Sequence, residues 1–92
     1  MIVSFGSRET DELFSYRHSK RFRAFGRVAL RQLLQLHAAT ELHVLASPPG
    51  NQLETLRGNR QGQRSIRIND QWRICFVWRD GHCYDVAIVD YR

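Results

Sequence analysis

Apolar residues recur every three or four positions between Phe22 and Ala39, which is the spacing of an amphipathic helix. The outer side of this stretch carries Arg23, Arg27 and Arg31. Two shorter helical segments flank it. Thr10 or Asp11 can act as N-cap of the first, and the second runs over 40–45 until two prolines end it. We therefore predict helices over about 10–46.

The apolar pattern changes period in the second half of the chain and becomes alternating. Residues 64–68 and 72–79 place bulky apolar side chains on one face, as half-buried strands do. Asp80-Gly81 is a strong hairpin signal, and the run 83–91 again favours a strand. These segments predict antiparallel strands over about 53–91.

Helices confined to the first half, followed by closely connected strands, predict the α+β class, with the helices packed on one face of a mostly antiparallel sheet. Residues 2–5 add a short strand at the edge. A chain of 92 residues is expected to form a single domain over 1–92. No apolar run approaches the roughly 20 residues of a membrane span, and the opening residues are too few for a signal peptide. We expect a cytoplasmic protein without membrane contact.

The charge is unevenly placed. The chain has 14 Lys+Arg against 9 Asp+Glu, a net charge of +5, and Lys20 is the only lysine. Arginine suits bidentate contact with phosphate and stacking on bases, so the bias favours a polyanionic partner; a GC-rich genome would produce the same bias. Residues 57–79 alone sum to +5, while 1–56 and 80–92 sum to +2 and −2. The basic region therefore lies in the first part of the predicted sheet.

Metal-ligand patterns are absent from the sequence. Cys75 and Cys83 lack zinc-motif spacing, and the four histidines are scattered. Both cysteines fall in strand-like runs, where a buried, unreactive thiol is the common outcome. We expect no metal site.

The hairpin at Asp80-Gly81 brings chemically useful residues to one end of the sheet. Its pairing places Arg73, near the start of one strand, beside Asp90 and Tyr91 at the end of the next. A cation, a carboxylate and a phenol then gather there. A surface ion pair with a tyrosine that anchors the last strand is the alternative interpretation.

A polar, glycine-flanked loop over Gly58–Gln63 is bounded by Arg57 and Arg64. It lacks the Lys-Ser/Thr ending of a phosphate-binding P-loop. Two interpretations stay open: a solvated connection between strands, or a basic loop that follows a nucleic-acid backbone.

Three strings of the second half carry a family resemblance: Leu53–Arg60, Ser65–Phe76 and Val86–Tyr91. They resemble the HigB-type toxins of the RelE/ParE superfamily of bacterial toxin–antitoxin systems. The opening residues Ile2–Phe5 and the stretch Ala38–Asn51 are similar to that family too, so the resemblance covers nearly the whole chain. Its most specific part is Ser65–Phe76.

The resemblance implies a compact α+β ribonuclease fold that cleaves mRNA in the ribosomal A site, with no metal or organic cofactor. It also implies a HigA-type antitoxin with a helix-turn-helix domain, through which the pair would bind operator DNA and repress its own promoter. Two other functions fit the same scaffold: a ParE-like gyrase inhibitor, and a non-catalytic, toxin-derived partner in antitoxin-dependent autorepression.

The resemblance also assigns roles to residues. RNA self-cleavage needs the 2′-OH deprotonated, the phosphorane stabilised and the 5′-oxygen protonated. Asp90 is the carboxylate for proton transfer, while Arg73 and Arg57 stabilise phosphate charge. Tyr91 stacks on a base or orients a phosphate oxygen. The arginines expected to bind RNA are Arg60, Arg64 and Arg67.

One position departs from the family pattern. HigB-type toxins typically end in Asp-Tyr-His, whereas this chain has Arg92 there. Histidine exchanges a proton near neutral pH and arginine effectively does not. We count Arg92 among the catalytic positions and expect weakened rather than absent cleavage, since a general acid–base step contributes roughly 10²–10⁴-fold.

Overall fold

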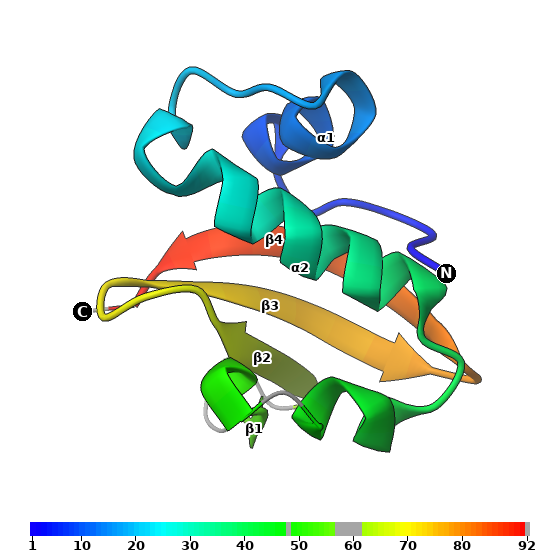
Figure 1. Cartoon of the computed structure of the whole chain (residues 1–92). Coiled ribbons are helices and arrows are strands. Elements are labelled where there is room, and N and C mark those ends of the chain that lie inside the picture. Colours follow the sequence, from blue (N-terminus) through cyan, green and yellow to red (C-terminus); the bar gives the residue numbers. More distant parts are fainter. Residues whose placement is uncertain (48, 57–61, 92) are drawn as a thin grey trace.

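The structure is a computed structural model in which residues 1–47, 49–56 and 62–91 are described. The first half holds α1 (Arg8–Tyr16), the 3₁₀ turn η1 (Arg23–Phe25), α2 (Gly26–Ala38), and the 3₁₀ turns η2 (Leu42–Ala46) and η3 (Pro49–Asn51). The second half forms β1 (Glu54–Thr55), β2 (Gln63–Arg67), β3 (Trp72–Arg79) and β4 (His82–Asp90). The strand order is β1-β2-β3-β4 with antiparallel neighbours, so the predicted α+β arrangement is confirmed (Figure 1).

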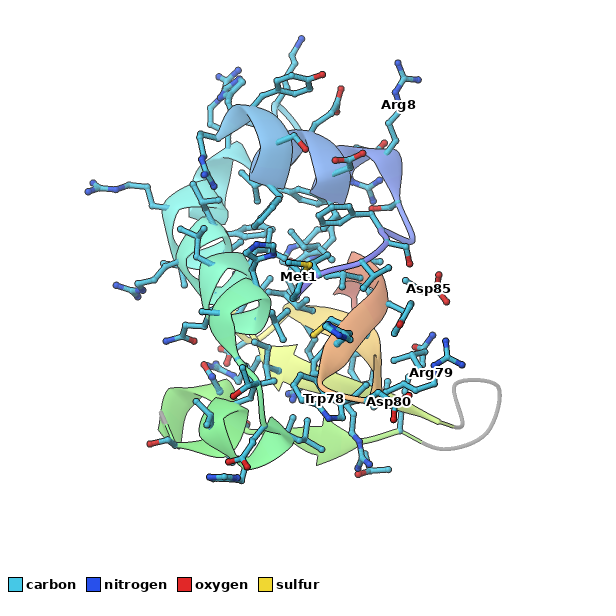
Figure 2. All side chains as sticks on the ribbon, turned by 90° about the vertical axis from the view of Figure 1, so that its right-hand side faces the viewer. Met1, Arg8, Trp78, Arg79, Asp80 and Asp85 are labelled. Atoms are coloured by element: carbon cyan, nitrogen blue, oxygen red, sulfur yellow. The ribbon has the colours of Figure 1, made fainter. Side chains whose placement is uncertain are left out.

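The helices form one layer and the sheet the other. Helix α2 lies across one face of the sheet, and α1 packs beside α2 near β4 (Figure 1). The core between the layers includes the fully buried side chains of Leu33, Leu36, Ile66, Ile74 and Phe76. Figure 2 shows α2 on one side of the sheet and Arg79 and Asp85 projecting from the other. Within the described ranges, no helix is long and apolar enough to cross a membrane.

The start of α1 differs from the prediction. The sequence pointed to Thr10 or Asp11 as N-cap, but Ser7 takes that position and its hydroxyl accepts from the Thr10 N–H at 3.3 Å. Thr10 is buried instead, and its Oγ1 accepts from the Ile88 N–H of β4 at 2.9 Å. The threonine hydroxyl thus joins α1 to the sheet, which leaves capping to the serine three residues earlier.

The helix predicted over 22–39 is divided into η1 and α2. Side chains three residues apart are nearly eclipsed in a 3₁₀ turn. Phe22 and Phe25 therefore both reach Trp72 of β3, with ring centroids 5.7 and 5.3 Å from the indole. The regular α-helix then begins at Gly26.

The segment 2–5, predicted as a short edge strand, runs along β4 without forming a continuous ladder. Its two isolated parallel bridges join Ile2 to Cys83 and Phe5 to Val86. Gly6 ends the segment in close contact with β4, because a Cβ at this position would lie 2.9 Å from the Asp85 carbonyl oxygen. The first residues of the chain thereby cover part of the free edge of β4.

β4 contains a bulge near its middle. Val77 pairs with Tyr84 and Cys75 pairs with Ala87, so two residues of β4 oppose one residue of β3. Asp85 lies in the bulge with φ of 55°, the left-handed conformation that such irregularities use. An extra residue reverses the face on which every later β4 side chain projects.

Candidate active site

Arg73 is a charged side chain held inside the protein, with only 7% of its surface exposed. Its register on β3 places it beside Val89, on the face opposite Ile74 and the core. Nε donates to Ser65 Oγ at 2.7 Å, and Nη2 donates to the carbonyl oxygens of Gln52 and Ser65. A buried charge is tolerated only with partners of this kind. The guanidinium is therefore fixed in position.

Glu54 and Tyr91 lie beside Arg73 and Ser65, and we call these four residues the Arg73 cluster. Glu54 Oε1 lies 3.7 Å from Arg73 Nη1, and its side chain is 51% exposed. The Arg73 guanidinium carbon lies 5.9 Å from the centre of the Tyr91 ring. The cluster thus combines a fixed cation with a solvent-accessible carboxylate and a half-exposed phenol.

Asp90 lies at the same end of the sheet but on its other face. It pairs with Trp72 across the β3–β4 ladder, whereas Arg73 pairs with Val89. Neighbouring residues of a strand project to opposite faces. The Asp90 carboxylate accepts from Gln71 Nε2 at 3.0 Å. The expected cation, carboxylate and phenol therefore share one end of the sheet without meeting, because the β4 bulge brings Tyr91, rather than Asp90, to the face of Arg73.

Glu54 was not among the candidates from sequence. It lies on β1, which has two residues and so has no periodicity to detect. β1 pairs Glu54 with Ser65, whose neighbour on β3 is Cys75, and this register carries the carboxylate toward Arg73. The only available signal was its presence in the Leu53–Arg60 string, which did not distinguish it from its neighbours.

The arginines expected to bind RNA divide between two faces. Arg64 pairs with Phe76 and donates to Thr55 Oγ1, while Arg67 pairs with Arg73 and forms an ion pair with Asp70. Three other candidates lie outside the described residues: they are Arg57, Arg60 and Arg92.

An open groove of 620 Å³ lies between the sheet and the loop before α1. Its lining residues include Gln63, Cys75, Ala87, Val89, Ser7 and Arg21. Val89 is the cross-strand partner of Arg73, so one end of the groove lies next to the strand position of Arg73. Because the groove is open to solvent, it can admit a polymer strand as well as a small molecule.

Both thiols are buried, as the sequence suggested. Burial raises the pKa of the Cys83 thiol from 9.0 to about 11, because the protein interior disfavours the thiolate. Among the described residues, no three His, Cys, Asp or Glu side chains gather into a possible metal site.

Comparison with known proteins agrees with this architecture. A family model described as a RelE-like toxin of the type II toxin–antitoxin system HigB matches residues 7–92. Toxin HigB-1 of Vibrio cholerae is 49% identical over 51 residues, which cover 55% of this chain. That alignment spans 54% of the relative, about half its length.

Solved structures share the fold at low identity. The YoeB–YefM complex from Staphylococcus aureus matches with a TM-score of 0.57 at 20% identity, covering 100% of this chain and 98% of the other. YafQ from E. coli matches with a TM-score of 0.57 at 15% identity, covering 98% and 93%. Since the family model covers residues 7–92, the chain belongs to the HigB-like family of RelE-like toxins from type II toxin–antitoxin systems.

Proposed function

We propose that this toxin is a ribosome-dependent mRNA endonuclease that inhibits translation. The observation that carries the proposal is the Arg73 cluster: a buried guanidinium fixed beside the Glu54 carboxylate and the Tyr91 phenol, on the sheet face away from α2. Family membership supports the same activity. The open groove beside Val89, the cross-strand partner of Arg73, provides room for an RNA strand.

The proposed reaction is attack of a ribose 2′-oxygen on the adjacent phosphate. A base removes the 2′-proton, the 2′-O–P bond forms, and the P–O5′ bond breaks as the 5′-oxygen gains a proton. The products are a 2′,3′-cyclic phosphate and a 5′-hydroxyl. This route needs proton transfer and charge stabilisation but no metal ion.

The residues divide these tasks according to their chemistry. Arg73 stabilises charge on the phosphate, because its planar fork can offer Nη1 to a phosphate oxygen while Nε and Nη2 stay bound to the protein. Glu54 and Asp90 are the two candidate proton acceptors, and Tyr91 stacks on a base or orients the phosphate. Arg57 adds electrostatic stabilisation. Arg92, at the position where relatives carry histidine, lowers the rate of protonating the leaving oxygen.

The proposed partners follow from family and charge. A HigA-type helix-turn-helix antitoxin neutralises the toxin, and operator DNA is bound only through that antitoxin. With a net charge of +5, the toxin attracts acidic antitoxin segments during encounter. The reading frame downstream of the gene should therefore encode a helix-turn-helix protein, and its absence would count against this partner.

A reconstituted translation reaction distinguishes the candidate activities. We expect primer extension to detect cleaved mRNA only when ribosomes are present. Intact mRNA together with a DNA-damage response in cells would support a ParE-like gyrase inhibitor instead. Intact mRNA without such a response would support a non-catalytic role in autorepression. Either of the last two results contradicts the proposal.

Single substitutions test the assignment of the site. Arg73→Ala is expected to lower the cleavage rate about 10²–10³-fold, the usual loss for one charge-stabilising donor. Glu54→Gln and Asp90→Asn separate the two candidate bases, and the true base should lose about 10²–10⁴-fold. Asp80→Asn is the matched control, because Asp80 lies in the β3–β4 turn at the other end of the sheet and asparagine tolerates its φ of 52°. Full activity in all three site variants would show that the site lies elsewhere.

Arg92→His tests the departure from the family pattern. Restoring a group that titrates near neutral pH should increase cleavage and toxicity on induction. Equal toxicity of the two proteins would remove Arg92 from the catalytic mechanism.

A further inference from the structure

Gln52 has a backbone conformation that glutamine rarely adopts. Its φ is 44°, in the left-handed region where the Cβ of an L-residue crowds its own backbone. Such a conformation persists only where the surrounding structure imposes it, and it often marks a functional site. The Gln52 side chain is exposed, so burial of that side chain does not impose it.

The main chain of Gln52 holds the guanidinium of the candidate active site. Its carbonyl oxygen accepts from Arg73 Nη2 at 2.5 Å, whereas the Ser65 carbonyl oxygen lies 3.4 Å from the same nitrogen. Ser65 Oγ accepts from Nε on the other side of the guanidinium. A main-chain carbonyl moves only when the backbone turns. The left-handed conformation of Gln52 therefore determines where Arg73 Nη2 is held.

Asn51, the residue before Gln52, is fixed by its side chain. Asn51 is only 5% exposed. Its Nδ2 donates to the Leu45 carbonyl oxygen at 2.9 Å and to Gln35 Oε1 at 3.4 Å, and its Oδ1 accepts from Gln32 Nε2 at 3.2 Å. The amide is thus bonded through both its nitrogen and its oxygen. The backbone here cannot turn without breaking buried hydrogen bonds, which are costly to leave unmade.

These contacts join the helical layer to the Arg73 cluster. Gln32 and Gln35 belong to α2, and Asn51 ends the turn η3, which lies against β2 near the β1 edge of the sheet (Figure 1). Arg73 lies on the face of the sheet opposite α2. A single residue, Gln52, therefore separates an anchor on α2 from a contact on the opposite face.

We propose that Asn51 is a positioning residue for Arg73. By fixing the backbone, it holds the Gln52 carbonyl against Arg73 Nη2, which leaves Nη1 to face the substrate phosphate. The phosphate rests on the proposed function, whereas the anchoring of the guanidinium does not. A charge-stabilising group is effective when it is held in place before the reaction. A displacement of about 1 Å can cost about 10²-fold in rate.

Arginine side-chain NMR of the ¹⁵N-labelled protein tests the anchoring without substrate. Rotation about the Cζ–Nη bonds averages the signals of unbonded Nη groups, whereas the bonded Nη2 of Arg73 should give a resolved signal that disappears in Arg73→Lys. Asn51→Ala should broaden this Nη2 signal, while the Nε signal persists because Ser65 still binds it.

Gln52→Ala is the matched control for the spectra. It shortens the neighbouring amide side chain, which is exposed, and keeps the carbonyl oxygen that Arg73 contacts. Both Arg73 signals should therefore remain. An unchanged Nη2 signal in Asn51→Ala, or loss of the Nη2 and Nε signals together, would overturn the proposed path through the Gln52 carbonyl.

Cleavage kinetics in the ribosome assay test the consequence for the proposed function. Asn51→Ala should lower kcat about 10–10²-fold with little change in KM, because the misplaced group acts in the transition state. The double variant Asn51→Ala/Arg73→Ala should be no slower than Arg73→Ala, since Asn51 acts only through Arg73. Multiplied losses would show that Asn51 acts independently and would overturn the inference. Thr10→Val removes a buried hydrogen bond between α1 and β4, so it controls for lower stability and should keep the wild-type rate where it is folded.

Gln32→Met keeps the inference testable if Asn51→Ala does not fold. Methionine has a similar length, and the substitution removes the donor to Asn51 Oδ1 together with Gln32 Oε1, which has no partner among the described residues. The Nη2 signal and kcat should change as in Asn51→Ala, by a smaller factor. An unchanged Nη2 signal in folded Gln32→Met would overturn the inference. A wild type that shows the Asn51-dependent Nη2 signal but cleaves no mRNA would refute the proposed function and leave the anchoring intact.

Discussion

Replacing Thr10 with valine tests how α1 is attached to the sheet. Thr10 Oγ1 accepts from the Ile88 N–H at 2.9 Å, and the two residues are 0% and 6% exposed. Valine keeps the shape but removes the acceptor, so no cavity forms and the Ile88 N–H remains buried without a partner. The Ser7 hydroxyl, 2.6 Å from Thr10 Oγ1, also loses a partner, but it lies near the surface where water replaces it.

The expected loss follows from the buried amide. An unpaired buried donor costs about 1–3 kcal/mol. For a domain of this size, each kcal/mol lowers the melting temperature by about 4–8 °C. Thr10→Ser is the control: it keeps the hydroxyl and removes one methyl group, for which we expect about 1 kcal/mol.

Urea and thermal unfolding of the three proteins measure these differences, and hydrogen exchange locates them. The Ile88 amide should exchange faster in Thr10→Val than in Thr10→Ser. If the valine variant is as stable as the serine variant, or if Ile88 remains equally protected in both, the hydroxyl does not hold α1 to β4.

Two further predictions concern the region around the β4 bulge. Gly6→Ala should lower the free energy of unfolding in urea by about 1–3 kcal/mol, since its Cβ would lie 2.9 Å from the Asp85 carbonyl oxygen. Gly50→Ala is the control and should change little, because a Cβ there meets nothing within 4 Å. Equal effects of the two substitutions would refute the steric argument. Burial raises the pKa of the Cys83 thiol from 9.0 to about 11, so between these values the unfolded chain forms a thiolate and the folded state does not. The free energy of unfolding should therefore fall as the pH rises from 9 to 11, by up to about 2–3 kcal/mol. Cys83→Ala should lose that part of the pH dependence, and an identical alkaline profile would contradict the assignment.

Much of the fold could be predicted from the sequence because the patterns that indicate it are local. Alternation over 64–68 and 72–79 set the faces of two strands, and the register that pairs Ile66 with Ile74 confirms them. The Asp80-Gly81 turn placed the hairpin correctly, with both residues at positive φ. Such patterns depend on residues a few positions apart, which a single sequence displays directly.

The candidate site was harder to predict because it depends on contacts between residues far apart in the sequence. Counting outward from the turn makes Arg73 and Asp90 neighbours, but an unbulged ladder would place Asp90 and Arg73 on the same face. The bulge at Asp85 adds one residue and exchanges the positions of Asp90 and Tyr91. No local sequence motif predicted the extra residue of the bulge. Glu54 was missed for a related reason, since a two-residue strand becomes visible only once its partner is known.

The bridges between the opening segment and β4 also bear on how the toxin is made. Ile2 and Phe5 find their partners, Cys83 and Val86, only after about eighty further residues have been synthesised. Contacts so distant in sequence slow folding, because a large loop must close before they form. A nascent chain can therefore complete neither the free edge of β4 nor the Arg73 cluster while its last strand is inside the exit tunnel. Vectorial synthesis thereby keeps the Arg73 cluster incomplete until β4 has left the tunnel.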